Sequence, residues 1–236
     1  MEFVSGNQPV RPAKITEKLG LSRTNVHRLL ATLMQIGYVT RDDRGYRLTY
    51  KMFQLGSRVP LTQDLREIAK PIMNALMEQA NENIYMTVLY EHMVIAMEEV
   101  KSRNTLSLNP DVTYTYPVHA CASGKVFLGA MDEATQDRLL DASGMDRLSE
   151  NTVTDTAEYK RQVDQARERG YATEVGEFRE DLNSYAAPIY DYRGQVVACI
   201  SISGPSIRAT KEVLDTHVDQ LLAAARDISH QLGQVD

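Results

Sequence analysis

Three serine side chains stand where a small anion could be bound. Ser201 and Ser203 alternate with two isoleucines in the apolar segment 195–204, so both hydroxyls face the same side of an expected strand. Ser123 follows Ala122 at the start of a helical segment, where small residues let a ligand approach the N–H groups of a helix N-terminus. Converging hydroxyl and N–H donors beside an apolar wall are typical of a pocket for a small anion.

A second group of side chains, near the N-terminus, suits the recognition of DNA. A helix in the major groove can place Arg28 bidentately on guanine and Asn25 on adenine. Hydroxyls at the start of that helix, together with its N-terminal N–H groups, suit phosphate oxygens. The candidate DNA-binding residues on this helix are Ser22, Arg23, Thr24, Asn25, His27 and Arg28.

The apolar pattern of the same stretch predicts the helix that carries these residues. Positions i, i+3, i+4 and i+7 form one helical stripe, made of Val26, Leu29, Leu30 and Leu33. Ser22 is a favourable N-cap, and Gly37 suits a left-handed C-terminal end. A shorter helix is expected over residues 12–19, with a break at Gly20. Two helices joined by a short glycine-containing turn indicate a helix-turn-helix.

The segment after this helix has the pattern of a β-hairpin. Residues 38–41 and 46–49 are expected to form strands, with residues 42–45 as the turn. A hairpin directly after a recognition helix is the wing of a winged helix. Its three arginines, which would meet phosphate groups, are Arg41, Arg44 and Arg47.

The charge of the chain is distributed unevenly. Residues 1–60 hold ten Lys or Arg and four Asp or Glu, a net charge of +6. The remaining residues hold 16 basic and 28 acidic side chains, a net charge of −12, and the two parts sum to the −6 of the whole chain. A basic module joined to a larger acidic one indicates a part that binds a polyanion and a part with another task.

The rest of the chain predicts a linker helix followed by a larger body. Apolar residues keep helical spacing up to residue 80, although Pro71 should end, kink or restart that helix. Paired strands are expected at 84–91 with 93–100 and at 184–191 with 195–204; helices are expected at 121–131, 133–143, 155–170 and 214–232. This mixture indicates an α+β body on a mostly antiparallel sheet. The expected domains are a winged helix-turn-helix at 1–58, a linker helix at 59–80 and the body at 81–236.

Several classes of protein fit the sequence poorly. No run of about 18 apolar residues exists, and the N-terminus lacks a basic region followed by an apolar one, so neither a membrane span nor a secretory signal is expected. Two cysteines, Cys121 and Cys199, form no disulfide framework, and reduced thiols in a cytoplasmic protein are expected.

Three alternative functions stay open at this point. His119, Cys121 and Ser123 could form a nucleophile and base of a small-molecule hydrolase, but no G-x-S-x-G elbow or complete phosphate-binding loop is present. Either cysteine could act as a redox switch. His119 with Glu174 could bind a metal ion, although the five histidines form no close pair, and neither a metal nor a cofactor is expected.

The sequence resembles the IclR family of bacterial transcriptional regulators over essentially its whole length. In the first module the resemblance rests on "LS-x-T-x-V-x-RLL-x-TL", "GYV" and "YRL-x-x-K-x-F-x-LG". In the body it rests on "YPVHACASGKVFLGAM" and "RERGYATEVGEFREDLNSYAAPIYDYRGQVVACISISGP". The first module is more similar to the sugar-acid regulators of the KdgR type than to the glyoxylate-type members of the family. One departure is that a longer first helix precedes this region in the family, whereas ten residues stand there in this sequence.

The resemblance implies a GAF-like effector-binding domain in the body. The family's ligand contacts fall on Thr105, Leu108, Tyr116, Ala122, Ser123, Glu174, Ser184, Ser201 and Ser203. Ser184 stands where cysteine is common, which suggests a more polar ligand. Because a carboxylate would repel an anion, Glu174 is expected to accept from a ligand hydroxyl or to hold an arginine.

Together these features predict a ligand-responsive transcriptional regulator, with repression favoured as its action, rather than an enzyme. It is expected to be a cytoplasmic homodimer or homotetramer that binds an inverted-repeat operator on double-stranded DNA. A small organic acid, such as a sugar acid or keto acid, would switch it by favouring one arrangement of the DNA-binding modules.

Overall fold

The computed structural model describes residues 1–56, 60–104 and 115–234. The chain divides into two compact units, Met1–Gln63 and Asp64–Asp236. Thr105 and Leu108, two of the expected ligand contacts, lie outside the described residues. Within the described residues, no helix is both long enough and apolar enough to cross a membrane.

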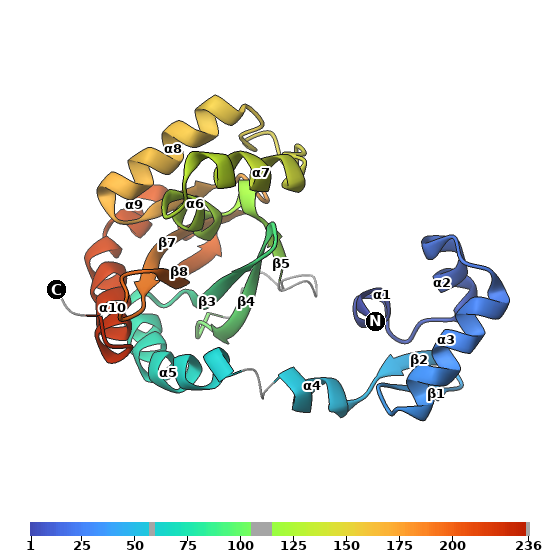
Figure 1. Ribbon diagram of the computed structural model, residues 1–236. Helices are drawn as coiled ribbons and strands as arrows, with labels where there is room; N and C mark the ends of the chain where they lie inside the picture. The colour runs from blue at the N-terminus through green and yellow to red at the C-terminus, as the bar shows by residue number, and fades with distance from the viewer. Residues whose placement is uncertain (57–59, 105–114, 235–236) are drawn as a thin grey trace. The chain divides into compact units, whose positions relative to one another are not determined.

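The first unit is a small helical module with a two-stranded hairpin (Figure 1). Its elements are α1 (Glu2–Ser5), α2 (Pro12–Leu19), α3 (Arg23–Gln35), β1 (Val39–Asp42), β2 (Gly45–Leu48) and α4 (Tyr50–Gly56). Its core consists of Val4, Val10, Ile15, Val26, Leu30, Val39 and Tyr46. A helix-turn-helix followed by an antiparallel hairpin is the winged helix that the sequence predicts.

The ends of α3 follow from single residues. The Ser22 side chain accepts a hydrogen bond from the Asn25 N–H at 3.3 Å, which caps the helix as expected. At the other end Gly37 has a φ of +77°, and the Tyr38 N–H bonds back to the Leu33 carbonyl. The inward position predicted for Leu29 is wrong, because its side chain is 50% exposed while Val26 and Leu30 fill the narrow core of this small unit.

The turn of the hairpin is tighter than predicted. The strands pair up to Asp42 with Gly45, so the turn consists of Asp43 and Arg44. The Asp42 carboxylate accepts from the N–H groups of Arg44 and Gly45 at 2.8 and 3.0 Å, which fixes the turn locally. Gly45 has a φ of +147°, and a β-carbon there would lie 2.7 Å from the Val10 carbonyl oxygen, so glycine lets the segment at Val10 pair with β2.

The second unit is built on one six-stranded antiparallel sheet with the strand order β5-β4-β3-β8-β7-β6. Its strands are β3 (Asn83–Tyr90), β4 (Met93–Val100), β5 (Thr115–Pro117), β6 (Ala172–Val175), β7 (Leu182–Tyr190) and β8 (Val196–Pro205). The predicted α+β class with an antiparallel sheet is confirmed. Strand β6 was not predicted, because its four residues carry no alternation long enough to recognise.

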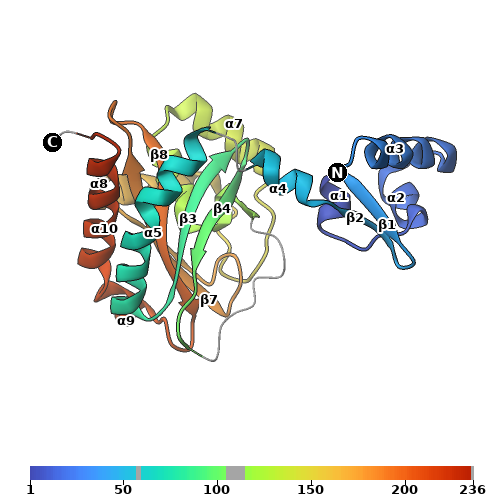
Figure 2. The ribbon, with the colours of Figure 1, turned by 90° about the horizontal axis from the view of Figure 1, so that it is seen from below.

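Helices cover both faces of this sheet (Figures 1 and 2). One face packs against α5 (Pro60–Ala80), α9 (Lys211–Asp215) and α10 (Val218–Gln231). The other packs against α6 (Ala122–Gly129), α7 (Glu133–Ser143) and α8 (Thr156–Arg169), with the short 3₁₀ helix η1 (Val118–Ala120) before α6. Alternate residues of a strand therefore belong to different cores: Ile200 and Ile202 face α5 and α10, whereas Cys199 faces α6.

Two helices differ from their predicted form. Helix α5 continues through Pro71, which lies on the exposed side of the helix. From Leu65 onward α5 packs into the core of the second unit. The single helix predicted over 214–232 is instead α9 and α10, because the chain turns at Thr216, whose hydroxyl bonds to the Val213 carbonyl at 2.7 Å.

Candidate functional sites

The polar residues predicted to read DNA lie on one exposed side of the first unit. All six candidates on and before α3 are exposed, while the buried residues of α3 are Val26 and Leu30. No acidic side chain stands in the first or last turn of this helix. The helix can therefore present its cations to a polyanion without opposition from a neighbouring carboxylate on its own surface.

The three arginines of the wing differ in their surroundings. Arg44 is exposed at the tip of the hairpin. The guanidinium of Arg41 lies 5.5 Å from the centre of the Tyr46 ring. Arg47 is half-buried and forms an ion pair with Asp42 at 3.1 Å, so part of its charge is already neutralised.

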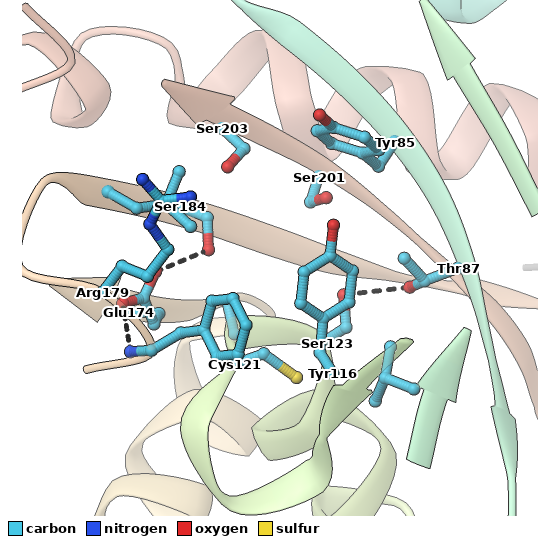
Figure 3. Close-up of a pocket in the computed structure, with 14 residues that line it drawn as sticks. Tyr85, Thr87, Tyr116, Cys121, Ser123, Glu174, Arg179, Ser184, Ser201 and Ser203 are labelled. Atoms are coloured by element: carbon cyan, nitrogen blue, oxygen red, sulfur yellow. Dashed lines mark hydrogen bonds between the residues drawn. The ribbon is translucent and has the colours of Figure 1, made fainter. Parts of the chain in front are cut away.

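A cavity lies in the second unit between the sheet and the N-terminus of α6 (Figure 3). Its volume is about 70 Å³. The sequence-predicted contacts that line it are Tyr116, Ala122, Ser123, Glu174, Ser184, Ser201 and Ser203. The structure therefore brings together every predicted contact that lies within its described residues.

Strand register explains why these side chains converge. Glu174 of β6 is paired with Ser184 of β7, and Ser184 is paired with Ser203 of β8. Paired residues in adjacent strands project to the same face, so these three polar side chains form a row across the sheet. Ser201 is paired with Tyr85 of β3 and lies in the next row on the same face.

The first turn of α6 forms the wall opposite the sheet. Gly124 allows this helix to lie close to η1, because a β-carbon there would come 1.8 Å from the Val118 carbonyl oxygen. The Ser123 hydroxyl accepts a hydrogen bond from Thr87 of β3 at 3.0 Å, which ties the helix N-terminus to the sheet. Cys121, Ala122 and Ser123 thus present a helix N-terminus to the cavity, where its partial positive charge favours an anion.

Glu174 is the carboxylate of this pocket, and its side chain is almost fully buried. One carboxylate oxygen accepts from the N–H groups of Glu177 and Phe178 at 2.6 and 3.1 Å. The other accepts from the Ser184 hydroxyl at 3.1 Å. Burial raises the pKa of Glu174 to about 7, more than these hydrogen bonds lower it.

A buried ion pair lies next to this carboxylate. Lys125 of α6 is 2% exposed, and its ammonium donates to Glu177 at 2.5 Å and to the Thr173 carbonyl at 2.9 Å. Burial raises the pKa of Glu177, while Lys125 opposes that rise. This pair orders the segment after β6, whose backbone N–H groups bind Glu174.

Three of the residues considered for catalysis or redox chemistry are buried: His119, Cys121 and Cys199. The Nε2 atom of His119 bonds to the Asp146 carbonyl at 3.0 Å, so the imidazole is held there by a backbone group. Burial raises the pKa of the Cys121 thiol to about 12, and Cys199 is also buried. Since the thiolate is the reactive form, burial disfavours the reaction of both thiols with an oxidant. Within the described part of the chain, no cluster of three metal-ligating side chains occurs.

Several lining residues were not predicted. Tyr85 and Thr87 stand on β3 at positions that alternate with the core residues Ile84 and Met86, so strand parity could have placed them on the pocket side. Phe178 and Arg179 line the cavity from the segment between β6 and β7, where no periodicity exists to orient a side chain, and Leu182 lines it from the first position of β7. The remaining lining residues are Val94 and Cys121.

These two sites define a class of protein, one that combines a DNA-binding winged helix with a separate small-molecule pocket. Comparison with known families agrees. The family model of the bacterial transcriptional regulator IclR C-terminal domain matches residues 59–230, and that of the IclR helix-turn-helix domain matches residues 3–43.

Individual relatives extend the match over almost the whole chain. The HTH-type transcriptional regulator KdgR of Escherichia coli is 32% identical over 94% of this chain and 86% of its own length. The transcriptional repressor IclR of the same organism is 29% identical over 99% of this chain and 87% of its own. Among solved structures, IclR of Thermotoga maritima has a TM-score of 0.74 at 26% identity, covering 98% of this chain and 95% of that one.

One solved relative contains a small molecule. An IclR homologue from Microbacterium hydrocarbonoxydans, complexed with 4-hydroxybenzoate, has a TM-score of 0.80 at 25% identity and covers 94% of this chain and 90% of its own. The present chain belongs to the IclR family of bacterial transcriptional regulators. It is an effector-responsive regulator with a DNA-binding helix-turn-helix domain and a ligand-binding C-terminal domain.

Proposed function

We propose that this regulator is a repressor whose DNA binding is switched by a small organic acid bound between α6 and the sheet. The observation that carries this proposal is the row of Glu174, Ser184 and Ser203 facing the N-terminus of α6 across one cavity. Hydroxyl donors and a helix N-terminus suit a carboxylate, and the mostly apolar remainder of the wall excludes water from it. The pocket has no catalytic task in this proposal.

The size of the cavity narrows the class of effector. One bound water needs roughly 10–15 Å³ of such volume, so a cavity of about 70 Å³ has room for a ligand of a few non-hydrogen atoms. A short keto acid or hydroxy acid is therefore the effector class that we propose first. The several hydroxyl groups of the wall favour a ligand with a carbonyl or hydroxyl besides its carboxylate.

The DNA-binding unit supports a two-fold symmetric target. A single winged helix reads a short half-site, and specific binding is normally reached by two copies on an inverted repeat. We therefore propose that the chain acts in the cytoplasm as a homodimer or homotetramer. Arg28 and Asn25 of α3 are the proposed base-reading residues, and Ser22, Thr24 and Arg44 the proposed phosphate contacts.

A thermal-unfolding screen with pyruvate, D-glycerate, D-gluconate, succinate and benzoate tests the effector class. A ligand at about 100 times its dissociation constant should stabilise the protein by about 2.7 kcal/mol. Variants Ser201→Ala and Ser203→Ala should lose the shift while keeping the melting temperature of the free protein within a few degrees. A shift that survives in both variants would place the ligand elsewhere, and a ligand that shifts melting without releasing operator DNA would contradict its role as effector.

A further inference from the structure

The buried carboxyl group of Glu174 raises a problem for a pocket that takes an anion. Its side chain lines the cavity and is 1% exposed, so little water screens its charge. An ionised carboxylate here would repel an anionic ligand at short range in a medium of low dielectric constant. A binding site for an acid therefore requires something that removes or compensates this charge.

The hydrogen bonds around Glu174 show where a proton can be placed. One carboxylate oxygen of Glu174 already accepts hydrogen bonds from two backbone N–H groups. A proton on this oxygen would point at those donors, so it is disfavoured there. The other oxygen has the Ser184 hydroxyl as its partner at 3.1 Å, and a hydroxyl can either donate or accept. A proton on this second oxygen can therefore be donated to the Ser184 oxygen along the same line.

The state of Glu174 sets the direction of the Ser184 hydroxyl. When Glu174 is ionised, Ser184 donates to it and shows a lone pair to the cavity. When Glu174 is protonated, it donates to Ser184, whose own hydrogen is then free to turn into the cavity. One proton thus removes a negative charge from the wall and adds a donor to it, through the hydrogen bond between Ser184 and Glu174 that Figure 3 shows as a dashed line.

We propose that effector binding is coupled to proton uptake at Glu174, so that the anionic acid binds the protein form in which Glu174 is neutral and Ser184 donates to the ligand. This inference rests on the proposed function of the cavity. It gives the regulator a dependence on pH as well as on effector concentration. Charge and protons balance in this binding step, because one effector anion and one solvent proton enter the site together.

The positively charged side chains around Glu174 do not offset its negative charge, because each is paired with another carboxylate. Lys125 of α6 is committed to Glu177, whose carboxylate offsets its charge at 2.5 Å. Arg179, which also lines the cavity, forms a two-point ion pair with Asp181 at 3.0 and 2.8 Å. The other titratable groups near the site are His119 of η1, Cys121 before α6, Tyr85 of β3 and Tyr116 of β5.

The pKa of Glu174 lies in the range where such coupling would act. Burial, the largest cause, and the neighbouring Glu177 raise it to about 7, so the free protein holds both forms near neutral pH. An anion bound nearby would raise it further, which by linkage is the same statement as tighter anion binding at lower pH.

Isothermal titration calorimetry with pyruvate and D-glycerate tests the proposal. Titrations in two buffers of different ionisation enthalpy report the protons taken up per ligand bound. We expect uptake approaching one proton at about pH 8 and little at about pH 6, with affinity falling about tenfold for each pH unit above the pKa of Glu174. This measurement uses the unaltered protein and so does not depend on any variant folding.

Glu174→Gln provides the matched comparison, since glutamine keeps the size and the neutral charge of the protonated form. It should bind the same probe with no proton uptake and with an affinity independent of pH. Glu133→Gln, a change on the exposed surface of α7, should behave as the unaltered protein. Binding without proton uptake in the unaltered protein would overturn this inference alone, whereas failure of both probes to bind either protein would overturn the proposed ligand class together with it.

Discussion

Arg28 and Arg47 both carry a guanidinium group in the DNA-binding unit, and they differ in whether a neighbouring carboxylate neutralises that charge. Arg28 is exposed on α3, whereas Arg47 pairs with Asp42. We expect Arg28→Ala to weaken operator binding by about 1–3 kcal/mol, because a bidentate base contact is lost. Arg47→Ala should weaken it less. Fluorescence anisotropy with an operator selected by the purified protein measures both.

The control for these two variants is Arg161→Ala, which removes an exposed arginine from α8 of the second unit. It should leave operator affinity unchanged. Melting temperatures should change little in all three variants, since Arg28 and Arg161 are exposed and the half-buried Arg47 is paired with Asp42 near the surface. A larger loss for Arg47→Ala than for Arg28→Ala would show that the wing, and not α3, dominates recognition.

Glu174 also makes the stability of the second unit depend on pH. Its pKa is about 7 in the folded protein and about 4.5 in the unfolded chain. Between these values the folded state holds a proton that the unfolded state lacks, so the free energy of unfolding falls as pH rises. This stabilisation is fully present below about pH 4.5 and lost by about pH 7, and it amounts to about 3 kcal/mol.

Urea unfolding at about pH 5 and about pH 8 measures this contribution. Glu174→Gln should lose about 2.5 kcal/mol less stability than the unaltered protein between the two conditions, because part of the stabilisation is already lost at about pH 5. Glu177 contributes in the same direction to both proteins, so the difference between them isolates Glu174. Parallel stability curves for the two proteins would mean that Glu174 ionises normally in the fold.

At the scale of elements, helix α6 depends on an ion pair that water cannot reach. Lys125 lies inside the second unit, paired with Glu177 and with the Thr173 carbonyl. Lys125→Met keeps most of the apolar stem of the side chain but leaves a carboxylate buried without its cation. Removing one partner of a buried pair typically costs about 3–5 kcal/mol. We expect a loss of this size in denaturant unfolding.

The exposed pair of Lys211 and Asp215 on α9 is the matched comparison. Its atoms also lie close, at 2.6 Å, but the lysine side chain is mostly exposed. Exposed ion pairs contribute little to stability, because water and salt screen them, so Lys211→Met should be nearly neutral. Similar losses for both lysine variants would contradict the dependence on burial.

The elements that the sequence predicted well have a local cause. Helix α3 is specified by the Ser22 cap and the Gly37 end, and β3 with β4 by an apolar pattern joined through a two-residue turn. The predictions that were wrong concern features that depend on what surrounds a residue in the folded chain. Leu29 has the spacing of a core residue but meets no partner, and the break between α9 and α10 interrupts a periodicity that continues on either side of Thr216.

The candidate pocket could be predicted only in part, for a physical reason. Ser201 and Ser203 alternate within one strand, and Ser123 begins a helix, so local pattern placed each of them. That they share one cavity with Glu174 depends on the strand order β3-β8-β7-β6, which no local pattern contains. The raised pKa of Glu174 follows from burial, which exists only after folding.

At the scale of the whole molecule, the separation of charge predicts two different responses to salt. The net charge of residues 1–60 is +6 and that of the remainder is −12. DNA binding releases counterions in proportion to the phosphates contacted, so its affinity should fall steeply between 50 and 200 mM salt. Effector binding in a buried cavity exchanges few counterions and should change far less.

Arg44 at the tip of the hairpin tests this separation with a single residue. If it contacts a phosphate, Arg44→Ala should reduce the slope of log affinity against log salt concentration by about one. The loss should be similar on operator and on unrelated DNA, because a phosphate carries no sequence information. The same variant should leave the calorimetric affinity for the effector unchanged at every salt concentration. An unchanged slope with a loss confined to operator DNA would instead assign Arg44 to a base edge, and the phosphate contacts of the wing would then have to come from Arg41.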